Sequence, residues 1–427
     1  MITSRTELRS ARWVGVLFGL VVAFQRFGIP GVPNIGLLVF VVLLWMAAAL
    51  VRGVIVMDRT RLAWWLAAAA TSAFAILLQS SLVVGAEISV TAWILVIVVW
   101  LPFAARLVTR GIPAYLAMLG YVANIATALA AAALAMVGLQ LAGVKYLDWF
   151  AAIVPQPLQL SGFNTVVPLA YGSDLVKANA WIGLEPSITS ALIGIGLLAA
   201  FFIRARMWMV VVLIAGLIAT VSGSGVVIVL VGGLVMVLHR SRRLLMRYLL
   251  LAAITVAAST FTQFGSLLVS RSTEYQSNDS STSLRATLPY SLLFPKWIEQ
   301  LPGMVFGYGP GSSQRVVTES NVLGLLVPSP AKIFFEYGLI AGFVLAAFIL
   351  GCYWGGPSRS FALALLFSLW ILQAGITTSV FVVPVLALVT LWSPRIGPPI
   401  ESILPLPANS APRPYWAHGS RQLERTG

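Results

Sequence analysis

The chain of 427 residues has few of the side chains on which most soluble enzymes depend. It contains one cysteine and two histidines, and charged residues make up only 9% of its length. A single cysteine, Cys352, excludes an internal disulfide. The histidines, His239 and His418, belong to no cluster of metal-ligand spacing, and neither lies in a long loop, which argues against a metal site and a Ser-His-Asp triad there. We therefore expect neither a metal nor another cofactor.

Apolar residues are abundant instead, at 59% of the chain with a mean hydropathy of +0.94. Soluble domains carry about 25% charged residues, whereas recurring runs of about 20 apolar residues are typical of membrane-spanning helices. The predicted fold class is all-α, a polytopic membrane bundle of about 12 transmembrane helices with a long helical loop outside the membrane. The predicted spans are residues 13–29, 35–51, 62–80, 88–104, 113–141, 186–203, 207–220, 224–238, 248–268, 331–354, 360–375 and 379–393.

Most lysines and arginines fall in the short loops on one side of these spans, together with both termini. Cytoplasmic loops carry such an excess of positive charge, so we place both termini in the cytoplasm. The net charge of +14 therefore gives no reason to expect nucleic-acid binding. The first apolar segment has no clear cleavage site after it and is interpreted as a retained helix.

This topology divides the chain into alternating membrane and loop regions. The tail from residue 394 is rich in proline and polar residues, and we predict it to be disordered. The regions are the N-terminal transmembrane helices 1–141, a first outer loop 142–185, central helices 186–268, a large periplasmic loop 269–330, C-terminal helices 331–393 and a cytoplasmic tail 394–427.

The large periplasmic loop combines apolar stretches, suited to short amphipathic helices on the membrane, with Arg271, Arg285, Lys296 and Arg315. Each base could be an ordinary surface residue, but together they could line a cationic cavity. The planar guanidinium group matches phosphate oxygens and never loses its charge. An enzyme on this face has no nucleotide available, so it would use a lipid-linked diphosphate donor whose leaving group needs cations.

Three glycines in the same loop, Gly307, Gly309 and Gly311, superficially suggest a phosphate-binding loop. The lysine of a Walker sequence is missing, which excludes a nucleotide site. Two interpretations remain open. The glycines could form a tight turn with positive φ, or their amides could approach a ligand closely.

The first outer loop carries Lys177 and ends at Glu185, which precedes Pro186 at the start of a span. Proline and a carboxylate both suit the first turn of a helix, yet a carboxylate at the mouth of a span is also a candidate site group. Arg26, at the outer end of the first span, is expected to extend to the lipid headgroups.

Several short motifs of this chain resemble those of the O-antigen polymerase and ligase superfamily of bacterial membrane glycosyltransferases. The resemblance covers roughly residues 170–345, and the hydropathy profile extends it over the rest of the chain. Each motif is short, but their order and their place on one predicted face give the set some specificity. The motifs are Leu184-Glu185-Pro186-Ser187, Ser222-Gly223-Ser224-Gly225, Arg271 with Glu274, Asp279-Ser280-Ser281 and Arg285, and Phe306-Gly307-Tyr308-Gly309-Pro310-Gly311 followed by Glu336-Tyr337-Gly338-Leu339-Ile340.

The resemblance implies a protein of the bacterial inner (cytoplasmic) membrane that transfers a glycan from undecaprenyl diphosphate without a metal. It implies that Arg285 and Arg271 bind the donor diphosphate, with Arg315 and Lys177 as less secure matches. Ligases of this superfamily usually carry a His-Asn pair where this chain has residues 327–331. The missing histidine favours a polymerase over a ligase and leaves the general base open.

We therefore predict an inverting polysaccharide polymerase that joins a lipid-linked glycan to the next lipid-linked repeat unit. A carboxylate would take the proton of the acceptor hydroxyl, and the candidates are Glu319, Glu185 and Glu336. Glu336 could instead pair with Lys332 one helical turn away. The alternatives are an O-antigen ligase and a flippase for lipid-linked oligosaccharides. A chain-length regulator protein is a possible partner.

Overall fold

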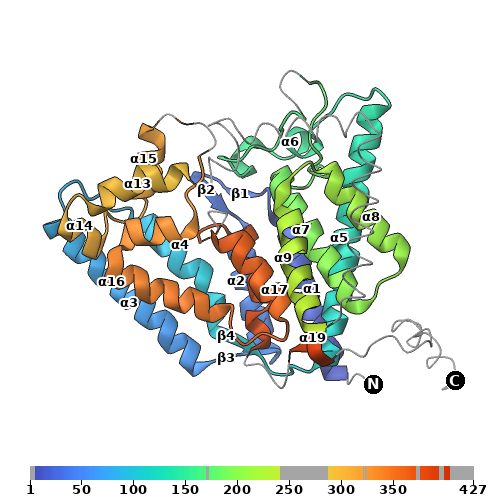
Figure 1. Cartoon of the computed structure of the whole chain (residues 1–427), viewed down its shortest axis with the longest axis horizontal. Coiled ribbons are helices and arrows are strands. Elements are labelled where there is room, and N and C mark those ends of the chain that lie inside the picture. The colour runs from blue at the N-terminus through green and yellow to red at the C-terminus, as the bar shows by residue number, and fades with distance from the viewer. Residues whose placement is uncertain are drawn as a thin grey trace.

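The computed structural model describes residues 5–169, 173–240, 287–320, 322, 325–371, 376–393 and 399–403, and the statements below concern these residues. It is 71% helical with few strands, so the prediction of a mainly helical protein is confirmed. A helix overlaps each predicted span (Figure 1), apart from 248–268, which lies outside the described residues.

The helices of the bundle begin and end close to the predicted boundaries. They are α1 (Arg5–Phe24), α2 (Leu38–Val51), α3 (Arg59–Leu82), α4 (Val90–Trp100), α5 (Ile112–Leu141), α7 (Pro186–Ile203), α8 (Met207–Ala219), α9 (Gly223–Arg240), α16 (Ser329–Cys352), α17 (Arg359–Leu365) and α18 (Ser379–Leu388). The first predicted span was wrong in position, because α1 ends at Phe24. The next residues form an antiparallel hairpin of β1 (Gly28–Ile29) and β2 (Val32–Gly36).

Four of these helices, α3, α5, α7 and α16, are long and apolar enough to cross a membrane by their length and composition, among the residues described. The shortest, α7, has 18 residues. At 1.5 Å per residue it spans about 27 Å, close to the thickness of the hydrocarbon core. Helices α2, α4, α8, α9, α17 and α18 are apolar but shorter. This set of helices indicates a membrane protein.

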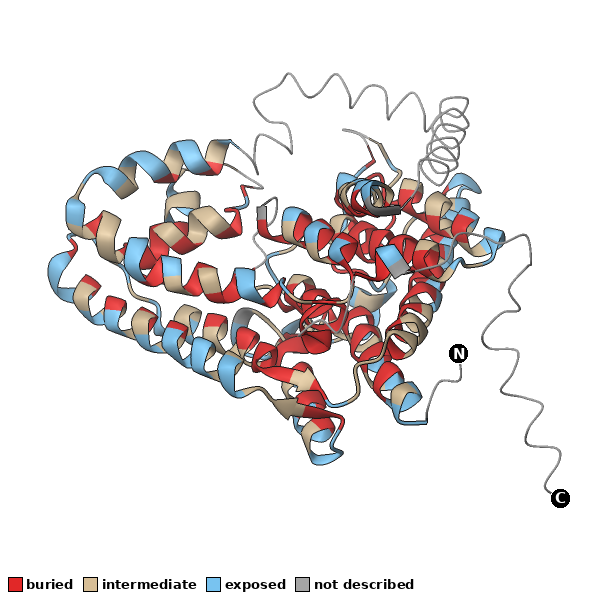
Figure 2. Cartoon of the chain, turned by 60° about the horizontal axis from the view of Figure 1, so that its bottom comes forward, coloured by how far each residue is buried: buried red, intermediate tan, exposed pale blue. Residues whose placement is uncertain are grey.

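Helix α7 lies at the centre of the bundle and packs on α5, α8 and α9. Its apolar window is 83% buried, against 22% for α3 at the periphery, and Figure 2 shows the same contrast. Small residues allow the close approach. A Cβ added at Gly196 would meet Ala126 of α5, and one added at Gly194 would meet the backbone of Gly225 in α9. Gly225 of the 222–225 segment thus serves helix packing, whereas nothing lies within 4 Å of a Cβ added at Gly223.

Loops predicted to share one face also contact one another at one end of the bundle, which we call the Arg61 end. Here β3 (Ile55–Met57) pairs with β4 (Ala105–Leu107). The Arg61 guanidinium donates to the carbonyls of Ala105, Thr390 and Ser393. The short helix α19 (Ile400–Ile403) lies near this end in Figure 1.

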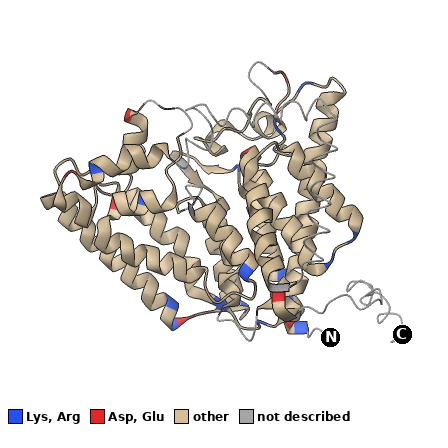
Figure 3. Ribbon diagram, viewed as in Figure 1, with Lys and Arg blue, Asp and Glu red and all other residues tan. Residues whose placement is uncertain are grey.

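The opposite end, which we call the Arg26 end, gathers β1, β2 and α6 (Trp149–Ile153), and Figure 3 shows most of the described charges near the two ends of the helices. A backbone bridge joins Phe27 to Gln159 there. Short 3-10 helices η1 (Leu101–Ala104), η2 (Gln156–Leu158) and η5 (Thr390–Trp392), and the π-helix η4 (Leu366–Ile371), complete the described elements.

The described part of the large loop is helical, as predicted for short segments there. It contains α13 (Leu288–Ile298), α14 (Leu301–Phe306) and α15 (Ser312–Glu319), which pack beside α16. Gln300 donates to the carbonyl of Val84 at 3.0 Å and so attaches this loop to the end of α3. Arg271 and Arg285 lie outside the described residues, as does the tail from residue 404.

Candidate functional site

The three glycines of the large loop form a turn that inserts into a break in α16. Gly307, Gly309 and Gly311 have φ values of 87°, 102° and 88°. Inside α16, Gly338 has φ 68° and ψ −172°, and Gly307 has φ 87° and ψ 174°. Only glycine adopts this combination readily. A Cβ at Gly307 would lie 2.5 Å from the carbonyl oxygen of Glu336, so the two backbones are in direct contact.

Hydrogen bonds join the glycine turn to the helical break. The N–H groups of Tyr308 and Gly309 donate to the carbonyls of Phe335 and Glu336 at 2.9 and 3.1 Å. The N–H of Gly307 donates to Gly303. Buried carbonyls released by a broken helix need such partners. These amides are used within the protein, which supports the tight-turn interpretation over that of amides directed at a ligand.

This junction also holds Glu336, which is 1% exposed. Its Oε1 accepts a hydrogen bond from the Ser313 hydroxyl of α15 and lies 3.8 Å from Nζ of Lys332. The predicted pairing with Lys332 is therefore present. The other oxygen, Oε2, is buried and has no partner among the described residues. Glu336 thus connects α15 to α16, and its burial keeps it from a substrate in this conformation.

A shallow pocket lies on the solvent side of the junction. Its lining includes Glu87, Lys296, Tyr308, Ser312 and Arg315, from the α3–α4 connection, α13, the glycine turn and α15. Tyr308 stacks on Phe335 with ring centroids 5.0 Å apart and donates its hydroxyl to the carbonyl of Lys296 at 2.6 Å. Burial raises the pKa of Tyr308, so the phenol stays protonated as a donor. We call this site the Arg315 pocket.

Arg315 bridges two carboxylates at the rim of this pocket. Its Nη1 contacts Glu87, and its Nε donates to Glu319 at 2.5 Å. All three side chains are about half exposed, at 49%, 49% and 51%. Exposed ion pairs contribute little to stability, roughly 0–1 kcal/mol. An anion from solvent can therefore replace either carboxylate on the guanidinium at small cost.

The other predicted site residues, Lys177 and Glu185, lie in a separate group. Lys177 is buried, and its N–H donates to Val167. The carboxylate of Glu185 precedes α7 without capping it, and accepts hydrogen bonds from the N–H of Asn164 at 3.0 Å and the hydroxyl of Ser187 at 2.9 Å. Helix α7 packs on α5, α8 and α9, whereas α15 packs on α13 and α16.

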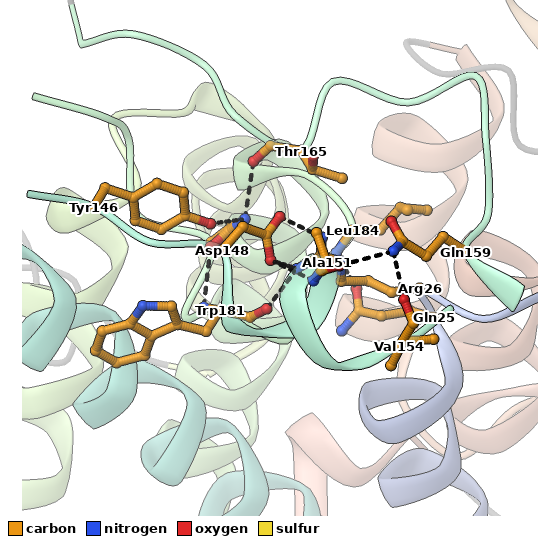
Figure 4. A network of polar contacts seen from close by, with 11 residues as sticks. Gln25, Arg26, Tyr146, Asp148, Ala151, Val154, Gln159, Thr165, Trp181 and Leu184 are labelled. Carbon is orange, nitrogen blue, oxygen red and sulfur yellow. Dashed lines mark hydrogen bonds and ion pairs between the residues drawn. The ribbon is translucent and has the colours of Figure 1, made fainter. Parts of the chain in front are cut away.

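A network around Arg26 holds Trp181 and Leu184, which precede Glu185 in the chain (Figure 4). The guanidinium donates to both carboxylate oxygens of Asp148, at 2.8 and 2.6 Å, and to the carbonyl of Trp181 at 2.7 Å. Its central carbon lies 4.4 Å from the centroid of the Phe150 ring. The side chain is buried, so the prediction that it extends to the lipid headgroups was wrong.

The backbone that reaches Glu185 is strained where this network holds it. Ala180 and Trp181 have φ values of 55° and 59°, which non-glycine residues seldom adopt in succession. The side chain of Asn179 accepts from the N–H of Trp181 at 3.0 Å. Gln25 accepts from the N–H of Leu184 at 3.1 Å. Such strain persists only where surrounding contacts determine the conformation.

The ion pair between Arg26 and Asp148 should contribute to stability in a pH-dependent way. Burial alone would raise the pKa of Asp148, but the hydrogen bonds from Arg26 and from the Ala151 N–H lower it below its ordinary value. A lowered folded-state pKa gives a contribution that is complete above the ordinary value of about 4 and is lost as the pH falls through the folded value. We expect Asp148→Asn to lower the free energy of unfolding by about 1–3 kcal/mol at pH 7.

Thermal unfolding of the purified protein and of Asp148→Asn, at pH 7 and at pH 3.5, measures this contribution. The difference between the two proteins should shrink at the lower pH, because Asp148 of the unfolded chain, at its ordinary pKa, takes up a proton there more readily than the folded protein does. A difference that grows as the pH falls would contradict the assigned ion pair.

The structure brings Arg315, Glu319, Glu336 and the three glycines together and leaves Lys177 and Glu185 elsewhere. Glu87 lies in a short loop between two predicted spans, near the outer interface, and no recognisable motif marks it as a site residue. Among the described residues, no group of three or more His, Cys, Asp or Glu side chains is placed to hold a metal ion. The sequence matches no protein-family model and no curated protein.

Proposed function

We propose that this chain is a membrane glycosyltransferase, a polysaccharide polymerase acting on lipid-diphosphate-linked glycans at the outer face of a bacterial inner membrane. The observation that carries the proposal is the Arg315 pocket. It combines a guanidinium and an ammonium group, Arg315 and Lys296, with the carboxylate of Glu87, and a second carboxylate, Glu319, pairs with Arg315 at the rim. A transferase for lipid-linked diphosphates needs both kinds of group within reach of one donor.

The surroundings of this pocket suit a substrate that is anchored in the membrane. Tyr290, Phe294 and Ile298 of α13 recur every fourth residue and are exposed, as are Leu301 and Val84 beside them. Such a stripe is typical of a helix lying in the lipid interface. It would place Lys296, on the same helix, at the depth of lipid phosphates.

In the proposed reaction, an acceptor sugar hydroxyl attacks the anomeric carbon of the donor glycan. The bond from that carbon to the diphosphate oxygen breaks, and the lipid diphosphate leaves with the bonding electrons. Arg315 and Lys296 stabilise its negative charge. Glu87 or Glu319 takes the proton of the attacking hydroxyl, once the donor has displaced it from Arg315. Glu336 positions α15 through Ser313. Arg271 and Arg285 remain predicted contacts of the diphosphate.

The purified protein, given an undecaprenyl-diphosphate oligosaccharide, should form longer lipid-linked glycans and release undecaprenyl diphosphate without a nucleotide. A ligase would instead need lipid A core as the acceptor. A flippase would only move the same molecule between leaflets of a vesicle. The polymerase would be rejected if no longer glycan formed and the protein instead transferred the glycan to lipid A core, or only moved the lipid-linked oligosaccharide between leaflets.

The proposed topology of about 12 spans places the Arg61 end in the cytoplasm, because the basic loops lie there. Alkaline phosphatase, which is active only outside the cytoplasm, should be inactive when fused after Gly427 and active when inserted at Gly162 in the first outer loop. Gly162 is exposed and has φ 83°. Activity of the C-terminal fusion would invert the topology and remove the Arg315 pocket from the outer face.

A further inference from the structure

A second pocket lies at the Arg26 end between α2, α4, the 160–163 segment and the start of α18. We call it the Ser379 pocket. One side of it is apolar and is formed in part by Leu38, Val39 and Leu95, which belong to the membrane helices. The other side carries hydroxyl groups of Thr377, Thr378 and Ser379. The pocket thus offers an apolar wall beside a polar one.

The polar wall is the N-terminus of α18. Thr378, the residue before the helix, makes no side-chain hydrogen bond to its first turn. In the part of the chain that the structure describes, the amide hydrogens of Ser379 and Val380 have no acceptor. Unpaired amides and the helix dipole together favour an anion at such a position.

A second observation points to a ligand here. The Ser379 side chain lines the pocket, although the residue is only 6% exposed. Its hydroxyl has no hydrogen-bond partner within the described ranges. The hydroxyl opens to the pocket, where a polar group pairs with water or with a ligand. A ligand oxygen at the N-terminus of α18 would pair this hydroxyl and the two free amides at once.

The two pockets differ in charge. No lysine, arginine, aspartate or glutamate lines the Ser379 pocket, whereas the Arg315 pocket contains two bases and an acid. Neutral donors can bind a phosphate, but a site without cations offsets less of the negative charge that develops on a leaving diphosphate than Arg315 and Lys296 do. The Ser379 pocket is therefore suited to hold a lipid phosphate that does not react, while the apolar wall receives the first isoprene units of its chain.

We propose that the Ser379 pocket binds the phosphate headgroup of an isoprenoid lipid and holds the acceptor substrate during transfer. This inference rests on the proposed function, because a polymerase joins two substrates that carry the same kind of lipid. The chain would then bind two isoprenoid diphosphates at once, the donor at Arg315 and the acceptor at Ser379.

Native mass spectrometry of the full chain in detergent, with undecaprenyl diphosphate as the probe, counts the bound lipids. The wild-type protein should bind two. Ser379→Ala should weaken one site about tenfold. Gly36 lines the same pocket, so the side chain introduced by Gly36→Val should occlude it. The fold should tolerate this change, because a Cβ at Gly36 makes only ordinary contacts, 3.6 Å from Leu160 and 3.8 Å from Oγ of Ser379. Ser80→Ala, on the exposed surface of α3, is the matched control and should still bind two.

Three outcomes would overturn the proposal. Both variants could retain two lipids with unchanged affinity, undecaprenol without a phosphate could bind as well as the diphosphate, or phosphatidylglycerol could displace the second lipid equally well. The last result would assign the pocket to ordinary membrane lipid. A wild-type protein that binds two lipids, loses one in both variants and yet forms no longer glycan would reject the polymerase while keeping the lipid-phosphate site.

Discussion

Replacing Gly307 by alanine is expected to lower the free energy of unfolding by about 2–5 kcal/mol, from backbone strain and overpacking together. The Cβ would lie 2.5 Å from both the carbonyl oxygen of Glu336 and the amide nitrogen of Gly338. Neither backbone atom can move without breaking the hydrogen bonds between the glycine turn and α16. Folded proteins are stable by only about 5–15 kcal/mol, so most of the folded protein should be lost on moderate heating.

Gly143→Ala provides a matched control for this substitution. Gly143 has φ 86°, nearly that of Gly307, but nothing lies within 4 Å of its would-be Cβ. It therefore carries the strain of positive φ without the overlap. Thermal unfolding and the yield of monodisperse protein in detergent compare the two variants. Equal stability of Gly307→Ala and Gly143→Ala would show that the contact between turn and helix does not determine the fold.

Much of this architecture could be predicted from the sequence, because long apolar runs in a membrane protein form helices. Helices α5 and α7 begin within a residue of the predicted spans and end where predicted. The exception was α1, where the predicted span ran on through Gln25 and Arg26 to residue 29, whereas the helix ends at Phe24 and the chain turns into the β1–β2 hairpin. Pro30 and Gly31 follow, and Gly31 has φ 77°. Hydropathy alone does not report such a turn.

The glycine turn and the Glu336-Tyr337-Gly338 segment were each identified from the sequence, but their union was not. The same sequence permits a free turn and an unbroken helix. The two segments join because the buried carbonyls of each need hydrogen-bond donors. Gln79 of α3 supplies two such bonds, since its side chain donates to the carbonyls of Phe306 and Glu336 at 2.5 and 2.9 Å. A glutamine within an apolar span gives no indication of a partner more than two hundred residues away.

Ion pairs between residues far apart in the chain could not be predicted from the sequence either. Arg315 and Glu87 are 228 residues apart, and Arg26 and Asp148 are 122 apart. Charge patterning places each residue on a face but does not choose its partner, since every acid on that face is a candidate. For Arg26, burial decided the outcome. A guanidinium that is 3% exposed must be paired within the protein, so the lipid headgroups were unavailable to it.

Replacing Arg315 by glutamine is expected to reduce the rate of glycan transfer by about 10²–10³-fold, the usual loss when a group that stabilises developing charge is removed. The stability of the protein should change by less than about 1 kcal/mol, because the Arg315 ion pairs are half exposed. A large loss of transfer rate with little loss of stability would assign Arg315 to the reaction. A residue that only supports the fold would lose both together.

Release of undecaprenyl diphosphate from a purified lipid-linked oligosaccharide measures the rate, and thermal unfolding measures the stability. Arg315→Lys keeps the charge and should recover part of the rate, although it cannot form the bidentate contact of a guanidinium with phosphate. Arg52→Gln, an exposed arginine beside β3 at the Arg61 end, should leave the rate unchanged. If Arg315→Gln transfers glycan at the wild-type rate, the Arg315 pocket does not hold the leaving diphosphate. The transfer site would then have to be sought at Arg271 and Arg285, the other arginines of the predicted outer loop.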